Sequence, residues 1–194
     1  DPDTGDTAVV DPAEAAPILD ALKRFGWKLT RILNTHHHND HIGGNKALVE
    51  ATGATVSAPD SAHARIPGID IGLKEGDTGK VGNSTFRVME VPGHTTGHIA
   101  LYFADDKAVF CGDTLFVLGC GKMFEGTPPQ MWHSLPTLRA LPVDTRVYCA
   151  HEYTQANCRF ALTVEPGNAQ RQARSEEIAR KRAAGKPTVL STIG

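Results

Sequence analysis

One run of six residues limits what this chain of 194 residues can fold into. Residues 36–41 read His-His-His-Asn-Asp-His, which contains the pattern H-x-H-x-D-H. Gathering so many imidazole and carboxylate groups costs free energy unless a partner such as a metal ion satisfies them. Because neighbouring side chains of an extended segment point to opposite sides, we expect His36 and His38 to project together and His37 to turn away. The run therefore predicts a metal site.

Short strands and helices alternate around this run, which indicates layers of helix and sheet rather than a helical bundle. A strand over residues 31–34 leads directly into the histidines, and residues 66–82 are expected to form turns. Four of the expected strands end at a His or an Asp, as in sheets that hold functional groups in the loops after their strands. Further strands are predicted at 7–10, 54–57, 86–91, 99–103, 108–111 and 146–149, and helices at 13–25, 45–51, 130–141 (interrupted at Pro136) and 169–186.

The later candidate ligands, His94, Asp113 and His151, each follow a predicted strand. Histidine and carboxylate ligands without a thiolate favour zinc, iron or manganese in an open site. Two such ions can hold a bridging hydroxide at neutral pH and polarise a carbonyl, which predicts hydrolysis without a protein nucleophile. No GxSxG motif offers a competing serine nucleophile. The predicted assembly has His36, His38 and His94 on one ion, Asp40, His41 and His151 on the other, and Asp113 bridging both, with Asp40 and Asp113 positioning the hydroxide.

Other histidines have more ordinary interpretations. His63 and His133 are isolated, so we interpret them as surface or capping residues. His98 stands four residues after His94, and two interpretations stay open for it: it orients a metal ligand by a hydrogen bond, or it is purely structural.

Composition excludes several classes of protein. The formal charge of 20 − 22 = −2 argues against a general nucleic-acid or membrane-surface binder. No apolar run approaches the roughly 18 residues of a membrane span. The four cysteines form no CxxC pair, which argues against a disulfide framework and for a reducing compartment. We therefore expect a cytoplasmic protein, or one of the mitochondrial matrix if the chain is eukaryotic, and a monomer, since a chain of this length needs no partner for its core.

Seven segments follow one another along the chain: THHHNDH (35–41), PGHTTGH (92–98), GDTLF (112–116), GCGK (119–122), FEGT (124–127), HEYT (151–154) and EPGN (165–168). Through them nearly the whole chain resembles the metallo-β-lactamase superfamily and, within it, the glyoxalase II or hydroxyacylglutathione hydrolase family. The resemblance implies an α+β fold, a four-layer αββα sandwich with a two-metal site at its edge and the start of a C-terminal helical region. It also implies hydrolysis of S-D-lactoylglutathione, a 2-hydroxyacylglutathione thioester, to glutathione and D-lactate.

The same resemblance assigns substrate contacts. It implies that Lys122 binds a glutathione carboxylate and that the Tyr153 hydroxyl donates a hydrogen bond beside His151. Phe124 stands where some family members carry Tyr, so one hydrogen bond to glutathione is expected to be missing. Two divalent ions per chain are expected, zinc first, with iron and manganese as alternatives. The expected partner is a small glutathione thioester, and neither nucleic acid nor membrane.

Two domains are expected, a catalytic domain over residues 1–166 and the beginning of a helical substrate-binding region over 167–194. The family has a further strand pair before the position of residue 1 and a basic stretch after that of residue 194, so both are expected in the natural protein. The alternative function is that of a persulfide dioxygenase of the same superfamily, with a single iron held by two His and one Asp. A β-lactamase is disfavoured because Asp113 stands where many such enzymes carry a metal-binding Cys.

Overall fold

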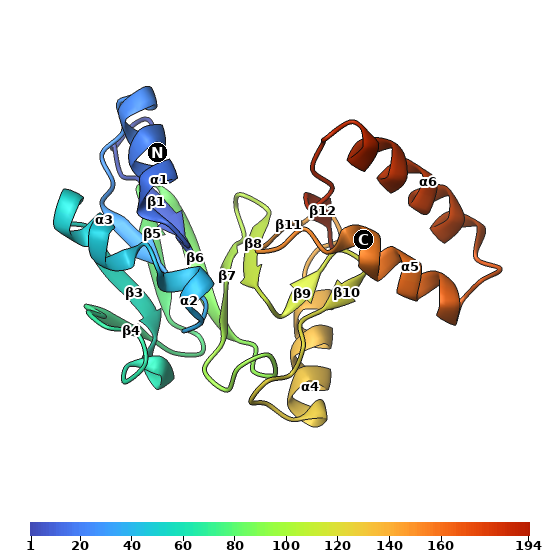
Figure 1. The fold of residues 1–194 in the computed structure, drawn as a ribbon. Helices are drawn as coiled ribbons and strands as arrows, with labels where there is room; N and C mark the ends of the chain where they lie inside the picture. Colours follow the sequence, from blue (N-terminus) through green and yellow to red (C-terminus); the bar gives the residue numbers. More distant parts are fainter.

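Two β-sheets face one another in the computed structural model, which describes residues 1–194 (Figure 1). The first sheet is parallel and has the order β1-β2-β3-β4, with β1 at Ala8–Val10, β2 at Arg31–Leu33, β3 at Thr55–Pro59 and β4 at Ile71–Leu73. The second sheet has the order β12-β11-β8-β7-β6-β5. Its strands are β5 (Thr78–Val81), β6 (Ser84–Glu90), β7 (Ile99–Phe103), β8 (Ala108–Gly112), β11 (Arg146–Cys149) and β12 (Ser191–Thr192).

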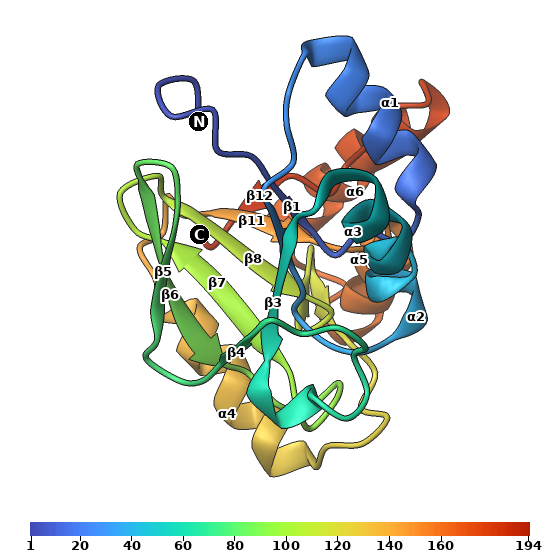
Figure 2. The same cartoon turned by 90° about the vertical axis from the view of Figure 1, so that its left-hand side faces the viewer.

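Alternating hydrophobic residues give the central strands β7 and β8 of the second sheet two buried faces. In β7, Leu101 and Phe103 point into the core between the sheets, where they join Leu33 of β2. The intervening Ala100 points to the opposite face and packs in a second core with Val109 of β8. Figure 2 shows β5 to β8 side by side in this sheet. A sheet that is apolar on both faces requires a cover on its outer side.

Helices supply the two outer layers. Leu22 of α1 and Leu48 of α3 pack with Ile32 on the outer face of the first sheet. Leu138 of α4 packs against Val147 on the outer face of the second sheet. The expected four-layer αββα sandwich is therefore confirmed. The helices of these layers are α1 (Ala15–Phe25), α3 (Asn45–Thr52) and α4 (Pro128–Arg139), and the short α2 (Asn39–Ile42) lies within the histidine run.

Beyond the sandwich, α5 (Thr154–Val164) and α6 (Ala169–Ala183) form a helical pair (Figure 1). Arg171 of α6 donates a hydrogen bond of 3.3 Å to the carbonyl oxygen of Ala161 in α5, and Ile178 is buried. The division of the chain near residue 166 stays a prediction. No helix combines the length and the apolar character that crossing a bilayer demands.

Several local predictions were wrong because tertiary contacts outweighed local signals. Pro136 does not interrupt α4, which begins at a capping box between Thr127 and Gln130 and buries Met131 on the same face as Leu138. The turn-rich segment 66–82 contains β4, which pairs with β3, and β5, which forms a hairpin with β6. No helix was predicted at α5. The remaining short elements, also unpredicted, are η1 (Asp60–Ala62), β9 (Leu115–Phe116) and β10 (Gly119–Cys120).

Candidate metal centre

The sheet topology brings the candidate ligands to one edge of the sandwich. In the second sheet β8 is parallel to β11, and β6 has the same direction because both β6 and β8 are antiparallel to β7. The carboxyl ends of these three strands therefore meet at one edge. His94 lies shortly after β6, Asp113 directly follows β8 and His151 lies shortly after β11. The histidine run follows β2 of the facing sheet, so all four loops converge.

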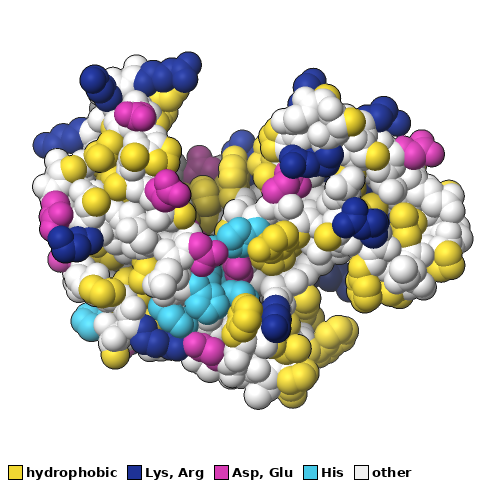
Figure 3. All heavy atoms as spheres, in the orientation of Figure 1, with side chains coloured by type: hydrophobic (Ala, Val, Ile, Leu, Met, Phe, Trp, Pro, Cys, Tyr) yellow, Lys and Arg dark blue, Asp and Glu magenta, His cyan; other side chains and the backbone are white.

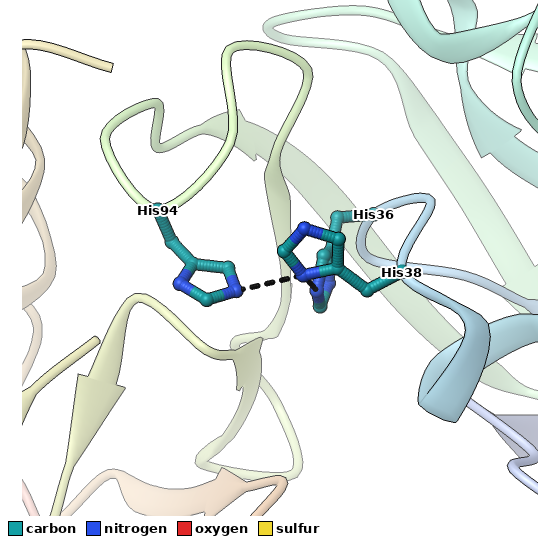
Figure 4. Close-up of side chains that lie close together, drawn as sticks. All are labelled: His36, His38 and His94. Carbon is teal, nitrogen blue, oxygen red and sulfur yellow. Dashed lines mark hydrogen bonds between the residues drawn. The ribbon is translucent and has the colours of Figure 1, made fainter. Parts of the chain in front are cut away.

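Three imidazoles form the first cluster. Nδ1 of His38 lies 3.1 Å from Nε2 of His36 and 3.0 Å from Nε2 of His94, and the two contacts are drawn in Figure 4. The rings of His36 and His94 come from different sheets, and both are buried. Three nitrogen atoms directed at one another in this way form a ligand set suited to a divalent transition metal.

Asp40, His41 and His151 form the second cluster. Nε2 of His151 lies 3.3 Å from Oδ2 of Asp40, and Nε2 of His41 lies 3.7 Å from the same oxygen. Asp113 lies between the clusters: its Oδ2 is 3.5 Å from Nε2 of His94 and 3.4 Å from Nε2 of His151. Its Oδ1 is 3.4 Å from Nε2 of His41. The structure thus brings all seven predicted ligands together, with Asp113 facing both groups.

Hydrogen bonds on the far side of the rings decide which nitrogen atoms are free. Nδ1 of His94 donates to the carbonyl oxygen of Lys122 at 2.7 Å, and Nδ1 of His41 donates to Oδ2 of Asp11 at 3.0 Å. The Thr35 hydroxyl gives its proton to Asp11, so it accepts from Nδ1 of His36 at 3.0 Å. In its neutral form each of these three imidazoles therefore presents an unprotonated Nε2 to the centre, which is the tautomer that binds a metal ion.

The buried polar atoms of this centre fit cations. Nε2 of His41 and Oδ1 of Asp113 are buried without any hydrogen-bond partner. Nδ1 of His38 can carry one proton at most, yet it faces two ring nitrogens that both lack one. Buried acceptors without donors are costly, and a bound divalent ion removes that cost.

Burial and neighbouring charges shift the pKa values of the clustered residues in different directions. Burial, helped by the neighbouring imidazoles, lowers the pKa of His36 far below its ordinary value, so this ring is neutral. Burial lowers the pKa of His41, but the hydrogen bond and the charge of Asp11 outweigh it and raise the value overall. Burial raises the pKa of Asp113 despite the histidines around it. Cations in the centre would favour the ionised form of this carboxylate.

His98 contacts two of the ligand candidates, Asp113 and His36. Its Nε2 accepts a hydrogen bond of 3.2 Å from the backbone N–H of Asp113, and its ring stacks on that of His36 at 4.6 Å between centroids. Burial lowers the pKa of His98 well below its ordinary value, so the ring is neutral and can act as this acceptor. Its contacts therefore match the interpretation that it orients ligands.

The other histidines lie away from the centre. His37 belongs to neither cluster, and its Nε2 lies 3.2 Å from Oε1 of Glu125. His63 and His133 are exposed on the surface. In Figure 3 the histidine side chains gather at the surface in the middle of the molecule, with acidic side chains next to them. The centre is thus open to solvent on one side.

The predicted substrate-binding residues surround this opening. The Phe124 ring lies 5.3 Å from that of His94, and the Lys122 ammonium lies 4.9 Å from the Phe124 ring centroid. The Tyr153 ring stacks on that of ligand candidate His151 at 5.2 Å. Phe124 and Tyr153 are 61% and 50% exposed, so both are available to a ligand.

Sequence reasoning missed Asp11, which was interpreted only as the end of the first strand together with Pro12. Its carboxylate accepts hydrogen bonds of 2.7 Å from both the backbone N–H and the hydroxyl of Thr35, besides the bond from His41. The residue adopts a left-handed conformation with φ of 49°. A signal was available, because Asp11 ends β1 just as Asp113 ends β8.

The variant Asp11→Asn is expected to reduce both zinc affinity and any hydrolytic activity by about 10- to 100-fold, the usual cost of losing a group that orients a metal ligand. An Asn keeps the size of the side chain and tolerates the left-handed backbone, but its amide offers a single acceptor oxygen to three donors. Zinc affinity is measured by competition with a chromophoric chelator. Asp20→Asn, on the exposed side of α1, is the matched control. Unchanged zinc affinity in Asp11→Asn would limit Asp11 to a role in folding.

Comparison with known proteins agrees with this geometry. The pattern of the Metallo-beta-lactamase superfamily matches residues 3–151, and that of the Hydroxyacylglutathione hydrolase C-terminus matches residues 152–194. A hydroxyacylglutathione hydrolase of Methylococcus capsulatus is 56% identical over 194 residues, which cover 98% of this chain and 76% of the relative. The chain belongs to the hydroxyacylglutathione hydrolase family of the metallo-β-lactamase superfamily. Hydroxyacylglutathione hydrolases are thioester hydrolases, so the chain belongs to a family of enzymes.

Solved structures place this family member in the same fold. ETHE1 from Myxococcus xanthus aligns with a TM-score of 0.71 and 33% identity, covering 79% of this chain and 68% of that one. The protein TTHA1623, solved in a di-iron-bound form, aligns with a TM-score of 0.62 and 32% identity, covering 73% and 79%. The fold and the His and Asp clusters together indicate a divalent-metal protein.

Proposed function

We propose that this chain hydrolyses the thioester of a 2-hydroxyacylglutathione, S-D-lactoylglutathione, to glutathione and D-lactate. The observation that carries the proposal is the convergence of seven His and Asp side chains beside exposed Lys122, Phe124 and Tyr153. Relatives that match the chain over its length are named hydroxyacylglutathione hydrolase, which supports the same substrate class.

Two divalent ions fit the centre, zinc first, with iron and manganese as alternatives. His36, His38 and His94 would hold one ion, Asp40, His41 and His151 would hold the other, and Asp113 would contact both. When bound, such ions polarise a carbonyl and lower the pKa of a water to near neutrality. The ordered Nδ1 hydrogen bonds of His36, His41 and His94 keep the ligand nitrogens free for this purpose.

The chain's own residues bind and orient the thioester. The Lys122 ammonium takes part in no salt bridge, so it is free to pair with a glutathione carboxylate. Phe124 offers an exposed apolar surface against the rings of His38 and His94, and the Tyr153 hydroxyl can donate beside His151. Together these contacts would hold the acyl group over the clusters. No side chain of the centre is a serine or cysteine nucleophile, which fits direct hydrolysis.

A hydrolysis assay tests the proposal. Zinc-loaded protein is expected to release one free thiol and one D-lactate for each S-D-lactoylglutathione consumed. A lactoyl thioester of a small thiol that lacks the glutathione carboxylates is expected to show a KM about tenfold higher, because Lys122 then has no charged partner. An intact thioester after incubation with the fully loaded protein would refute the proposal.

The persulfide dioxygenase alternative is not favoured, because the matched relatives and the C-terminal pattern are those of hydroxyacylglutathione hydrolases. Oxygen uptake on glutathione persulfide, with one iron per chain, would support it instead. A monomeric state and a cytoplasmic location stay predictions, to be checked by light scattering and by localisation of the tagged protein.

A further inference from the structure

The loop of residues 121–126, which carries Lys122 and Phe124, lies against the loops that carry His94 and Asp113. Phe124 N–H donates to the carbonyl oxygen of His94 at 3.1 Å, and Gly126 N–H donates to that of Gly93 at 3.2 Å. A Cβ atom at Gly126 would lie 2.5 Å from the Gly93 oxygen, and one at Gly121 would clash with the Asp113 backbone. Both ends of the loop therefore need glycine to lie this close.

A single carboxylate, that of Glu125, joins this loop to both histidine loops. Its Oε1 lies 2.5 Å from Nη1 of Arg65 and 3.2 Å from Nε2 of His37, which stands between ligand candidates His36 and His38. Its Oε2 accepts hydrogen bonds from the backbone N–H of Thr96 at 3.0 Å and from the Thr96 hydroxyl at 3.1 Å. Thr96 is two residues from His94, so each oxygen faces a different ligand loop.

This network is more than a surface ion pair. An isolated exposed ion pair such as Arg65 with Glu125 contributes little by itself to the stability of the fold. Here Arg65 also donates to the Thr96 hydroxyl at 3.3 Å, so Arg65, Thr96 and Glu125 all contact one another. The Glu125 side chain is only 27% exposed. Although burial raises the pKa of Glu125, the hydrogen bonds from Thr96 and Arg65 lower it to about 2. The carboxylate is thus charged at neutral pH and accepts hydrogen bonds from three donors, with His37 close to one of its oxygens.

Glu125 is adjacent to Phe124 in the chain, so the contacts of Glu125 also affect where Phe124 and Lys122 lie. The Phe124 ring lies 5.6 Å from that of His38 and 5.3 Å from that of His94, and Lys122 lies over its face. Neither Lys122 nor Phe124 has a polar side-chain contact that would fix its place. Their distance from the first cluster therefore depends on how firmly the loop is held.

We propose that Glu125 is a positioning residue, which fixes the 121–126 loop against the two histidine loops so that Lys122 and Phe124 meet the glutathione part of the substrate at a set distance from the ligands. Glu125 itself touches neither substrate nor ligands. The inference rests on the proposed function, because it concerns binding of the same thioester.

Glu125→Gln is the test variant, because it keeps the size of the side chain but leaves one acceptor oxygen for three donors. We expect KM for S-D-lactoylglutathione to rise about tenfold while kcat changes by less than about threefold, since only binding geometry is loosened. The number of zinc ions per chain is expected to stay the same. Glu50→Gln, at an exposed ion pair with Lys46 on α3, is the matched control and should change neither constant.

A double-mutant cycle separates positioning from a general structural effect. If Glu125 acts through Lys122, then Glu125→Gln should raise KM much less in a Lys122→Ala background than in the parent. Independent, multiplicative effects of the two substitutions would overturn the proposal, as would an unchanged KM in Glu125→Gln. If Glu125→Gln does not fold, Arg65→Gln removes one donor of the same network and is expected to raise KM in the same direction. An unchanged KM there would also overturn it.

Limited trypsin digestion gives a readout that needs no substrate. Loosening the loop should speed cleavage after the exposed Lys122 by about fivefold in Glu125→Gln and not in Glu50→Gln, because proteolysis requires local opening. Mass spectrometry identifies the fragment. If the parent chain does not hydrolyse the thioester, the proposed function fails, and the digestion alone decides on Glu125. Equal cleavage rates in Glu125→Gln and the parent would then overturn the role of Glu125.

Discussion

Replacing Asp113 by Asn is expected to lower kcat/KM for the thioester by about 10³-fold or more, on the scale of losing one essential electrostatic group in an active site. The reason is its place between the clusters, with Oδ2 3.5 Å from Nε2 of His94 and 3.4 Å from Nε2 of His151. An amide is neutral and offers one oxygen where the carboxylate offers two. We therefore also expect fewer than two zinc ions per chain, measured by elemental analysis after dialysis.

The matched control is Asp105→Asn in the exposed turn after β7, which should leave activity and zinc content unchanged. Circular dichroism establishes that both variants are folded. An Asp113→Asn protein that keeps more than about a tenth of the parental kcat/KM would contradict a shared ligand at this position.

The convergence of the seven candidate ligands could be predicted because its signal is local. His36 and His38 share a face of an extended segment, and the later ligands follow hydrophobic strands that are recognisable from their alternation. His94, Asp113 and His151 each stand just past such a strand. Since the carboxyl ends of parallel strands meet at one edge, a pattern that repeats at strand ends predicts a shared site without any knowledge of the pairing.

The supporting residues could not be predicted in the same way, because their signal exists only in three dimensions. Asp11 reaches His41 and Thr35 only once β1 pairs with β2, and Glu125 reaches His37 and Thr96 only once three loops meet. Each is an ordinary acidic residue in the sequence. Similarly, β4 depends on its pairing with β3, and β5 is a short, half-exposed strand in a hairpin with β6, so the segment that contains them reads as turns.

There is a physical reason why the ligand candidates could be predicted and the residues that orient them could not. Ligands must converge from rigid elements, so their positions are tied to strand ends and leave a regular trace in the sequence. The groups that orient them need only reach a ring nitrogen or a backbone N–H, which many loop positions can do. Asp11 reaches its ring nitrogen from the end of β1, and His98 accepts from the backbone of Asp113 out of the segment just before β7.

Removing bound metal with a chelator is expected to abolish hydrolysis and to lower Tm by roughly 10 °C. Ions present at about 1,000 times their Kd stabilise the folded chain by about 4 kcal/mol, and for a chain of this size each kcal/mol corresponds to about 2–4 °C. The structural reason is the set of unpartnered acceptors at the edge of the sandwich, Nε2 of His41 and Oδ1 of Asp113, together with the facing ring nitrogens around His38. Differential scanning calorimetry before and after dialysis against the chelator measures the shift.

Restoration distinguishes metal binding from damage by the chelator. Adding zinc back should recover both Tm and activity in the parent, whereas magnesium should recover neither, because nitrogen ligands suit zinc and not the hard, oxygen-seeking magnesium ion. In Asp113→Asn the gain in Tm on adding zinc should be smaller than in the parent, since the one side chain that faces both clusters has lost its charge. Equal Tm values with and without zinc in the parent would mean that these buried acceptors are satisfied by something other than a cation, and the seven residues would then lose their assignment as ligands.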